Sequence, residues 1–458
     1  MDSDLELFRN QLREIKTDPK IQLPQISKSS LSLEANKKSQ IKPTILIIDD
    51  DVNIRTALKI TLGKKYNLNL CSNGNDGIAQ MTGEVFAVIL DIKMEGKNGF
   101  ETFTEIKKKN FYVPIIFYSA YQDIKDPMEI MNDFRPFGYV VKGSESNELL
   151  HTLESAVDYY LQINRNVILN QIYQKFVPKE FLDYLGKSDI TEIRLGDQTQ
   201  KEMSVMFSDI RDFTSLSETM SSEENFKFIN AYLKRIVPQI KINNGFIDKY
   251  IGDAIMALFP NKPENAVNAS IQMLEELSLY NQYRISKEER PITIGIGIHT
   301  GLLTLGIVGD IDRMESTVIS DVVNLASRIE KLTRMYEAPI LISELSFQKL
   351  EDPTIYQFRV VDTVKVKGKK EPVTVIEILN GNSPDVIELK LLTKRDFEFG
   401  TALYHRKEFK AAQSCFTKVI EKNPQDKAAK IYLKRSEYFA IHGISPEWEG
   451  IETINKGF

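Results

Sequence analysis

The sequence predicts a chain of several domains, with an α/β region first, an α+β region second and a short helical tail last. At 458 residues the chain is too long for a single hydrophobic core. Between residues 44 and 148, short apolar runs alternate one by one with helical stretches, which is typical of a parallel sheet. Between 203 and 380 the apolar runs come in pairs between helices, which is typical of α+β architecture.

Composition limits the class of function. A formal net charge of −5 indicates neither nucleic acid nor an anionic membrane as partner. The two cysteines, Cys71 and Cys415, fall in segments expected to form separate domains, which argues against a disulfide framework and for a reducing compartment. Four scattered histidines argue against a histidine-built metal site. No apolar run approaches the ~18 residues of a bilayer span, and no signal-peptide core is visible, so we expect a cytoplasmic protein.

The first two segments differ sharply in polarity. Residues 1–43 are polar and rich in Lys, Ser and Gln, which predicts a flexible arm. Residues 44–148 contain the apolar runs TILII, NLNLC, FAVILD, VPIIFYSA and GYVVK, separated by helical stretches such as NIRTALKITL. This alternation predicts a doubly wound parallel sheet. Acidic or polar residues follow several runs, at the strand ends where open α/β sheets place their sites.

A helical linker is predicted over 149–195. Its apolar positions follow imperfect heptad spacing: Leu149, Leu153, Val157, Leu161, Ile168, Ile172 and Phe176. We expect a surface helix of the first domain that continues into a dimerisation and signalling linker.

The region 196–380 begins with the alternating strand MSVMFSDI. A capping box from Ser221 to Glu224 opens a helix, in which Pro238 is a candidate kink and which Asn244-Gly245 ends. The stretch DKYIGDAIMALF predicts a hairpin that turns at Gly252-Asp253. A helix (264–280), strands ITIGIGI and LLTLGIV, the helix DVVNLASRIEKLT, the strand PILIS and the hairpin VKVKGKKEPVTVIEI follow. This order predicts a split-βαβ core.

The tail, 390–443, is predicted to be helical. Within 392–424 six residues have the offsets of a tetratricopeptide unit: Gly400, Leu403, Phe409, Ala412, Phe416 and Pro424. A single unit cannot stack on itself, so we expect the following helix, AAKIYLKRSEYF, to cap it and the pair to pack on the chain or on a protein partner. A C-terminal tail, 444–458, completes the chain.

Two carboxylates stand out because each follows or interrupts an apolar strand. Asp209 ends VMFSD and Asp253 ends KYIGD. If these strands are neighbours the carboxylates meet, and they then repel unless a proton or a cation lies between them. Hard oxygen ligands of this kind suit Mg²⁺, and paired metals can hold an in-line displacement. The alternative is that both are ordinary turn residues.

Asn324 and Arg328 are four residues apart on one predicted helix and therefore share a face. We expect that face to be otherwise apolar, with Val322, Leu325 and Ile329 nearby. An arginine there could stabilise a transferring phosphoryl group. The alternative is a surface arginine paired with Glu330 or Glu315.

Four motifs in order resemble class III nucleotide cyclases: FSDIRDFTSL, DKYIGDAIMALF, GIGIHTG and STVISDVVNLASRIE. The preceding segment, VPKEFLDYLGKSDITEIRLGDQTQKEMSVMFSDIR, is similar to the lead-in of bacterial members. The resemblance implies a ferredoxin-like α+β core. It also implies that Asp209 and Asp253 bind two divalent ions, Mg²⁺ or Mn²⁺, with help from the backbone carbonyl of Ile210.

The same resemblance assigns the substrate-binding residues. Lys249 and Thr317 would read the purine, because lysine with threonine or aspartate is the adenylyl pattern and glutamate with cysteine the guanylyl one. Asn324 would orient the ribose, and Arg328 would stabilise the pentavalent phosphate. Metal pair and base-reading group come from different subunits in this family, so we expect a homodimer with its sites at the interface.

Three positions depart from the cyclase motifs. Asp212 and Ser320 stand where the family has glycine, and Leu302 replaces an arginine that faces phosphate in some members. The departures touch none of the residues assigned above, so they bear on rate and regulation rather than on identity.

Residues 44–148 resemble a response-regulator receiver domain, which has a flavodoxin-like sheet. By this resemblance Asp49 and Asp50 bind Mg²⁺ together with Asp91, the phosphoacceptor. The remaining residues of the resemblance are those expected to contact the phosphoryl group or to switch: Ser119, Lys142 and the aromatic Tyr139. Lys142-Gly143 replaces the usual Lys-Pro, and Glu95 replaces a usual proline. The alternative is a receiver-shaped dimerisation module that is not phosphorylated.

Together these resemblances predict an adenylate cyclase that converts ATP to cyclic AMP and pyrophosphate in a two-component system. A sensor histidine kinase would phosphorylate the receiver, and the linker would transmit the change to the cyclase dimer. Two alternatives remain open, a guanylate cyclase and a non-catalytic phospho-dependent scaffold.

Overall fold

The structure is a computed structural model that describes residues 42–120, 127–144, 146–173, 176–366, 371–444, 448 and 451–454. The predicted arm, 1–43, lies outside the described residues apart from its last two, and so does most of the predicted tail 444–458. The chain divides after residue 175 into two compact units, each of which has its own sheet. The units are described separately below.

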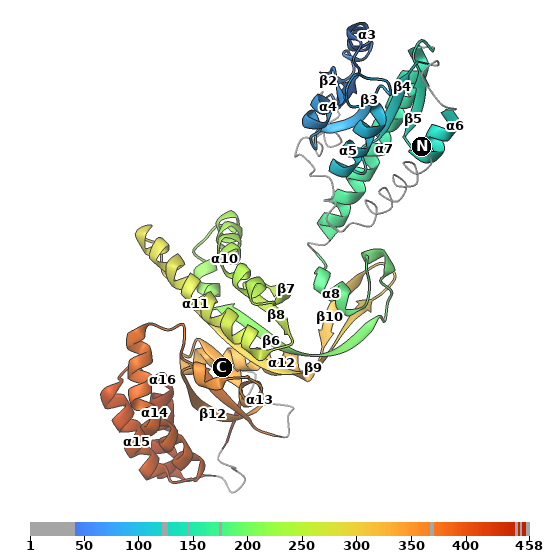
Figure 1. Ribbon diagram of the computed structural model, residues 1–458. Coiled ribbons are helices and arrows are strands. Elements are labelled where there is room, and N and C mark those ends of the chain that lie inside the picture. The colour runs from blue at the N-terminus through green and yellow to red at the C-terminus, as the bar shows by residue number, and fades with distance from the viewer. Residues whose placement is uncertain are drawn as a thin grey trace. The chain divides into compact units, whose positions relative to one another are not determined.

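The first unit is a five-stranded parallel sheet with the order β2-β1-β3-β4-β5, the flavodoxin-like order (Figure 1). Its strands are β1 (Thr44–Ile48), β2 (Asn67–Cys71), β3 (Val85–Leu90), β4 (Ile115–Ser119) and β5 (Gly138–Val141). Its helices are α3 (Val52–Leu62), α4 (Gly74–Gln80), α5 (Gly99–Lys109), α6 (Pro127–Asp133) and α7 (Ser146–Tyr173). The predicted parallel sheet is confirmed.

Local sequence explains where these elements begin. Asp51 and Asn73 accept hydrogen bonds at the starts of α3 and α4, and Asn98 forms a capping box with Glu101 at the start of α5. Every residue of β3 is buried because helices cover both faces of a parallel sheet.

Helix α7 belongs to the first unit through its first half. Leu153 and Tyr160 are fully buried in that unit's core, whereas Ile172 and Tyr173 are exposed. The predicted boundary at 148/149 therefore falls inside a helix that packs on the sheet before it emerges. The role of the exposed half in dimerisation stays a prediction.

The second unit is built on a nine-stranded sheet with the order β14-β12-β13-β11-β9-β6-β8-β7, and β10 pairs with β9 off this path. Its strands are β6 (Gln198–Ile210), β7 (Phe246–Ile251), β8 (Ala254–Pro260), β9 (Ile294–Gly309), β10 (Met314–Ile319), β11 (Ile340–Ser343), β12 (Phe358–Val366), β13 (Val373–Ile378) and β14 (Glu452–Ile454). Its α-helices are α8 (Lys179–Tyr184), α9 (Phe213–Ser217), α10 (Ser222–Ile242), α11 (Pro263–Ser286), α12 (Asp321–Tyr336), α13 (Glu344–Gln348), α14 (Pro384–His405), α15 (Phe409–Lys422) and α16 (Lys427–His442).

Alternation along the strands separates two layers around this sheet. Met206, Ile255 and Ala257 face a core shared with α10 and α11, whereas Val205 and Met256 face the opposite side, where α12 packs (Figure 1). The polar ends of β6 and of the β7–β8 hairpin emerge at one edge of these layers, which is where the candidate site lies.

Two strand predictions need correction. ITIGIGI and LLTLGIV form one continuous strand, β9, because the intervening His299–Gly301 stays extended and pairs with β6. Strand β10 was not predicted, since its sequence MESTVI is half polar and reads as the approach to the next helix.

The predicted capping box of α10 and the predicted hairpin are confirmed. Ser221 and Glu224 form the capping box, and the helix ends at Ile242, just before the predicted Asn244-Gly245. Pro238 lies inside the helix, and a kink there stays a prediction. Strands β7 and β8 pair antiparallel around a turn in which Gly252 has a φ of 66°. Glycine suits that conformation because it has no Cβ.

The tail helices α14, α15 and α16 pack on one another and on the second unit itself. Phe397, Phe416 and Tyr432 share a buried cluster with Val361 of β12 and Leu332 of α12. The sequence predicts that the tail packs either on the chain or on a protein partner, and in the structure it packs on the chain. The likeness to a tetratricopeptide unit stays a prediction.

Candidate functional sites

Asp209 and Asp253 come together because β6 and β8 are antiparallel neighbours, with Ser208 opposite Ile255. The two carboxyl groups are close enough to share a hydrogen bond, and the Ile210 amide donates to Asp253 Oδ2 at 3.2 Å. Burial and the neighbouring Asp209 raise the pKa of Asp253 to about 7. Two carboxylates that compete for one proton form a donor set that fits a divalent cation.

Glu330 is a third carboxylate at this place, and sequence reasoning considered it only as a partner of Arg328. Helix α12 packs closely on β9, so that a Cβ on Gly297 would lie 2.1 Å from the Glu330 backbone nitrogen. Gly295, beside the Glu330 carboxylate, pairs with Asp209 in the sheet. Burial and then the charge of Asp209 raise the pKa of Glu330 to about 7. The sequence signal that could have identified Glu330 is its position four residues after the buried Ala326, which places both residues on one face of the helix.

Lys249 lies at a different place from this acidic pair, on β7 where it faces β10. Its Nζ is 3.3 Å from Glu315 Oε1. Thr317 is two residues further along β10 and therefore on the same face of that strand as Glu315. The structure thus gathers both predicted base-reading residues around Glu315, which pairs with Lys249.

Asp248 is a second buried carboxylate that sequence reasoning missed. It lies at a bulge in β7, its side chain is 1% exposed, and its Oδ2 is 3.7 Å from Lys249 Nζ. Within the described parts of the chain, neither of its oxygens has a hydrogen-bond partner. Burial, opposed by Lys249, raises the pKa of Asp248 to about 6. A carboxylate inside an apolar strand was the signal that could have identified it.

Helix α12 carries the remaining predicted residues of this unit. Ser320 caps it by accepting from the Val322 amide at 3.1 Å, and its hydroxyl donates to the Leu302 carbonyl at 2.9 Å. Asn324 is exposed and Arg328 half-buried, on one shared face as expected.

The prediction that this face is otherwise apolar holds only at its border. Residues on an α-helix advance by about 100° each, so the buried Leu325 lies about 60° from Arg328, whereas the buried Val322 and Ile329 lie about 100° or more from it. For the same reason Arg328 and Glu330, two positions apart, point about 200° away from each other. Glu330 is turned toward Asp209 of its own chain, so Arg328 is turned away from it.

In the first unit the acidic residues at the carboxyl ends of β1 and β3 converge. Carboxylate oxygens of Asp49, Asp50 and Asp91 all lie within 4.8 Å of one another, which fits a divalent cation. Lys142 Nζ is 2.8 Å from Asp49 Oδ2 and 2.7 Å from Asp91 Oδ2. Burial raises the pKa of Asp49, although Lys142 opposes the rise.

Ser119 and Lys142 end neighbouring strands of this sheet, and the Lys142 amide donates to the Ser119 carbonyl at 2.8 Å. The Ser119 hydroxyl is buried and has no hydrogen-bond partner within the residues that the structure describes. Gly143 has a φ of 90°, a value that proline cannot adopt. The exchange of the usual proline for glycine therefore changes the backbone after Lys142. Tyr139 lies half-buried on β5.

Comparison with protein families finds a match in each of the two regions that carry these sites. Residues 195–378 match the adenylate and guanylate cyclase catalytic domain, and residues 45–154 match the response regulator receiver domain. The chain carries a class III cyclase domain and a receiver domain.

Two curated relatives are similar over part of their length. The terminal-differentiation specific adenylate cyclase of Dictyostelium discoideum is 40% identical over 276 residues, which are 58% of this chain and 13% of that protein. The adenylate cyclase of Anabaena cylindrica is 41% identical over 226 residues, 48% of this chain and 45% of that protein. The chain thus spans less than half the length of either relative. The crystal structure of the adenylyl cyclase CyaB from P. aeruginosa is 32% identical, with a TM-score of 0.37, over 41% of this chain and 98% of that chain.

One departure of the cyclase domain from its motif has a structural consequence. Asp212, which stands where the family has glycine, has a φ of 56° in the left-handed region. Glycine adopts this conformation without strain, whereas other residues do not. Asp212 Oδ1 lies 3.7 Å from Arg334 NH2, an exposed ion pair.

No described helix in either domain is long and apolar enough to cross a bilayer.

Proposed function

We propose that the protein is an adenylate cyclase that converts ATP to 3′,5′-cyclic AMP and pyrophosphate. The observation that carries this proposal is the pair Asp209 and Asp253, which meet at the edge of a cyclase domain, where burial and the neighbouring Asp209 raise the pKa of Asp253 to about 7. A half-buried carboxylate pair is unfavourable in itself, and a function in binding cations explains why the chain contains it. The two relatives named as adenylate cyclases support the same reaction.

In this proposal Asp209, Asp253 and the carbonyl of Ile210 hold two divalent cations, Mg²⁺ or Mn²⁺. Cations bound there would neutralise the triphosphate and lower the pKa of the ribose 3′-hydroxyl. Asn324 orients the ribose so that its 3′-oxygen lies in line with the α-phosphorus. The 3′-hydroxyl gives up its proton to solvent water, the new P–O bond forms as the bond to pyrophosphate breaks, and Arg328 stabilises the charge on the five-coordinate phosphorus.

We further propose that each active site is built from two copies of the chain. Glu330 faces Asp209, so Arg328 of the same helix is turned away from its own acidic pair. Arg328, Asn324, Lys249 and Thr317 of one copy would therefore meet the acidic pair of the other. A homodimer with its sites at the interface follows.

For the base, we propose that Lys249 and Thr317 read adenine. A site that hydrogen-bonds its substrate discriminates strongly against one whose edge does not match. The test is product identification with purified protein, a divalent cation and either MgATP or MgGTP. We expect cyclic AMP, with ATP favoured by orders of magnitude in kcat/KM, and we expect Lys249→Glu with Thr317→Cys to erode that preference. Equal kcat/KM for the two nucleotides would favour an unselective or guanylyl enzyme, and no cyclic nucleotide at all would favour a scaffold.

For the receiver, we propose that Asp91 accepts a phosphoryl group from a sensor histidine kinase in the cytoplasm. The Asp91 carboxylate attacks the phosphorus of phosphohistidine, the P–N bond breaks and the imidazole leaves. A cation held by Asp49, Asp50 and Asp91 would neutralise the incoming charge, and Lys142 already lies 2.7 Å from Asp91. The Ser119 hydroxyl, which is buried and has no hydrogen-bond partner among the described residues, would donate to a phosphoryl oxygen. Tyr139 would respond as the switch aromatic, and α7 would carry the change toward the cyclase domain.

A further inference from the structure

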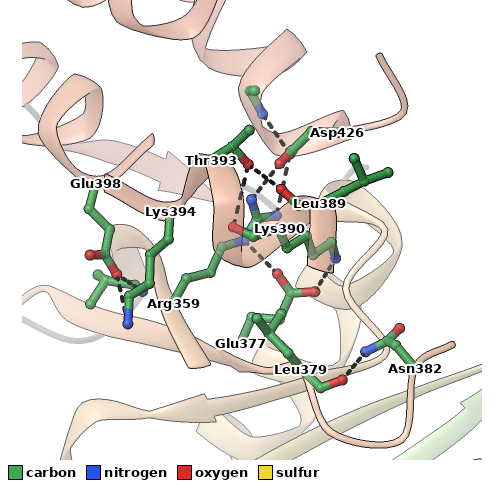
Figure 2. A network of polar contacts seen from close by, with 12 residues as sticks. Arg359, Glu377, Leu379, Asn382, Leu389, Lys390, Thr393, Lys394, Glu398 and Asp426 are labelled. Atoms are coloured by element: carbon green, nitrogen blue, oxygen red, sulfur yellow. Dashed lines mark hydrogen bonds and ion pairs between the residues drawn. The ribbon is translucent and has the colours of Figure 1, made fainter. Parts of the chain in front are cut away.

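The helical tail is attached to the cyclase sheet by a buried network of charges (Figure 2). Arg359 of β12 donates from Nε to Glu377 Oε2 of β13 at 2.7 Å, and its NH1 and NH2 groups donate to Asp426, just before α16. Lys390 of α14 donates to the other oxygen of Glu377. The guanidinium of Arg359 also stacks on Phe397 of α14, 4.5 Å from the ring centre. The two cations, Arg359 and Lys390, and the two anions, Glu377 and Asp426, cancel in charge, so the buried network is neutral.

A second junction joins the tail to α12, the helix that carries Asn324 and Arg328. Tyr336, in the last turn of α12, donates its hydroxyl hydrogen to Asp362 Oδ2 of β12. From the tail, Arg435 NH1 lies 3.5 Å from that oxygen and His405 Nε2 lies 4.0 Å from Asp362 Oδ1. Tyr336 is 1% and Asp362 2% exposed, so water does not compete for these contacts. Beside them, Lys427 of α16 pairs with Glu337 at the end of α12, at 3.0 Å.

The same turn of α12 is also tied to the strand that carries the acidic pair. Arg211, two residues after Asp209, donates from NH2 to the carbonyls of Thr333 at 2.9 Å and Ala338 at 3.2 Å. The C-terminal end of α12 is therefore fixed between β6 on one side and the tail on the other. No role in the reaction proposed above accounts for the tail side of this arrangement.

We propose that Tyr336 and Asp362 are positioning residues, through which the tail sets the place of Arg328 in the active site. The inference rests on the proposed function, in which Arg328 contacts the reacting phosphate. Tyr336 lies eight residues after Arg328, about 12 Å along a stiff helix, so movement of the last turn is passed on to the arginine. Catalysis is sensitive to such movement, because a misplacement of about 1 Å can lower a rate by about 10²-fold. The tail is then part of the catalytic unit and not a separate binding module.

The test uses the full-length protein and Tyr336→Phe, which removes the hydroxyl group and keeps the ring. We expect kcat for cyclic AMP formation to fall by about tenfold or more while KM for ATP stays within about twofold, because Arg328 acts mainly in the transition state. Lys422→Ala is the matched control, since it breaks an exposed pair with Asp396 inside the tail that does not touch α12. We expect its kcat to equal that of the wild type.

Coupling to Arg328 separates positioning from plain stability. In an Arg328→Ala background, Tyr336→Phe should cause almost no further loss, because there is no arginine left to misplace. A purely structural role predicts the same fold-loss in both backgrounds, following the folded fraction measured by circular dichroism, and would overturn the inference. If Tyr336→Phe fails to fold, Arg435→Met, which loosens Asp362 from the tail side, is assayed in the same two backgrounds with the same two expected outcomes. Wild type that makes no cyclic AMP refutes the proposed function, whereas active wild type with an equally active Tyr336→Phe refutes only the positioning role.

Discussion

The two domains each gather carboxylates at strand ends, but they balance the charge differently. In the receiver, Lys142 lies within 2.8 Å of Asp49 and Asp91 and supplies a cation from the same chain. In the cyclase domain, Asp209 and Asp253 lie beside each other, with the half-buried Glu330 as a further acid next to them. The receiver site thus has one lysine of its own chain against three carboxylates, whereas Asp209 and Asp253 have no ion pair among the described residues. That difference is expected of half a cyclase site, which needs metal ions and the cationic residues of a second copy.

The largest expected effect tests the acidic pair. Asp209→Ala should lower cyclic AMP formation by at least about 10³-fold, more than the 10²–10³ usual for one transition-state donor, because the cation site itself is lost. Asp49→Ala, the matched change in the receiver, should leave basal activity in the absence of phosphodonor near that of the wild type. Initial rates at saturating Mg²⁺ and Mn²⁺ measure both variants. An Asp209→Ala protein that keeps a tenth of the activity would contradict the role of the pair.

The next effect concerns Asp91. Asp91→Ala should abolish any change in cyclase rate caused by a small phosphodonor and should leave the basal rate unchanged, because the phosphoacceptor is lost but the cyclase residues are not. Rates with and without phosphodonor, together with mass analysis of the intact protein, measure this. A variant that still responds like the wild type would show that control enters elsewhere.

A smaller effect, on stability, concerns Asp248, which is paired with a lysine less closely than Asp49 is. Lys249 Nζ lies 3.7 Å from Asp248 Oδ2, whereas Lys142 Nζ lies 2.8 Å from Asp49 Oδ2. Because the pKa of Asp248 is raised from its ordinary 3.8 to about 6, the folded protein binds more protons than the unfolded chain between these values. The free energy of unfolding therefore falls as pH rises through this window and levels off above it. Lys249 and Glu315 are the charged groups that act on Asp248.

Asp248→Asn should remove this dependence. The stability of the variant relative to the wild type should rise by up to about 3 kcal/mol from pH 4 to pH 7, the value of the pKa difference in free energy. Urea denaturation of both proteins across that range measures it, with the exposed Asp385→Asn as control. Parallel stability curves for the Asp248 variant and the wild type would show that Asp248 is ionised throughout.

The smallest effect concerns Asp212, whose left-handed φ of 56° suits glycine. Asp212→Gly should raise the free energy of unfolding by up to about 1 kcal/mol, because relief of strain outweighs the loss of an exposed ion pair with Arg334. Asp212→Ala keeps the Cβ and loses the carboxylate, so it should destabilise the protein. Chemical denaturation ranks the three proteins, and a glycine variant less stable than the alanine variant would contradict the strain argument.

Sequence reasoning reached what depends on local pattern. Hydrophobic alternation predicted the sheets, the capping box predicted the start of α10, and the positions of Asp209 and Asp253 at strand ends predicted that they meet. Sequence reasoning did not predict features that depend on how helices pack on the sheets. Whether Glu330 or Arg328 faces the sheet depends on the rotation of α12, and sequence reasoning considered Glu330 only as a possible partner of Arg328.

The tail shows the same limit more strongly. Arg359 and Asp426 are 67 residues apart in the sequence. The sequence alone does not indicate that these two charged residues meet in the interior. The tetratricopeptide pattern concerned the tail alone, whereas the structure shows that the tail packs on β12 and α12.

The measurement that tests the central claim most directly is complementation between two inactive proteins. Asp209→Ala should be almost inactive, and Arg328→Ala should lose about 10²–10³-fold. After subunit exchange, verified by different tags, half the dimers are mixed, and each has one site with both defects and one site with neither. We therefore expect recovery to about one quarter of the wild-type rate. Verified mixed dimers that stay as inactive as their parents would show that each chain holds its own complete site.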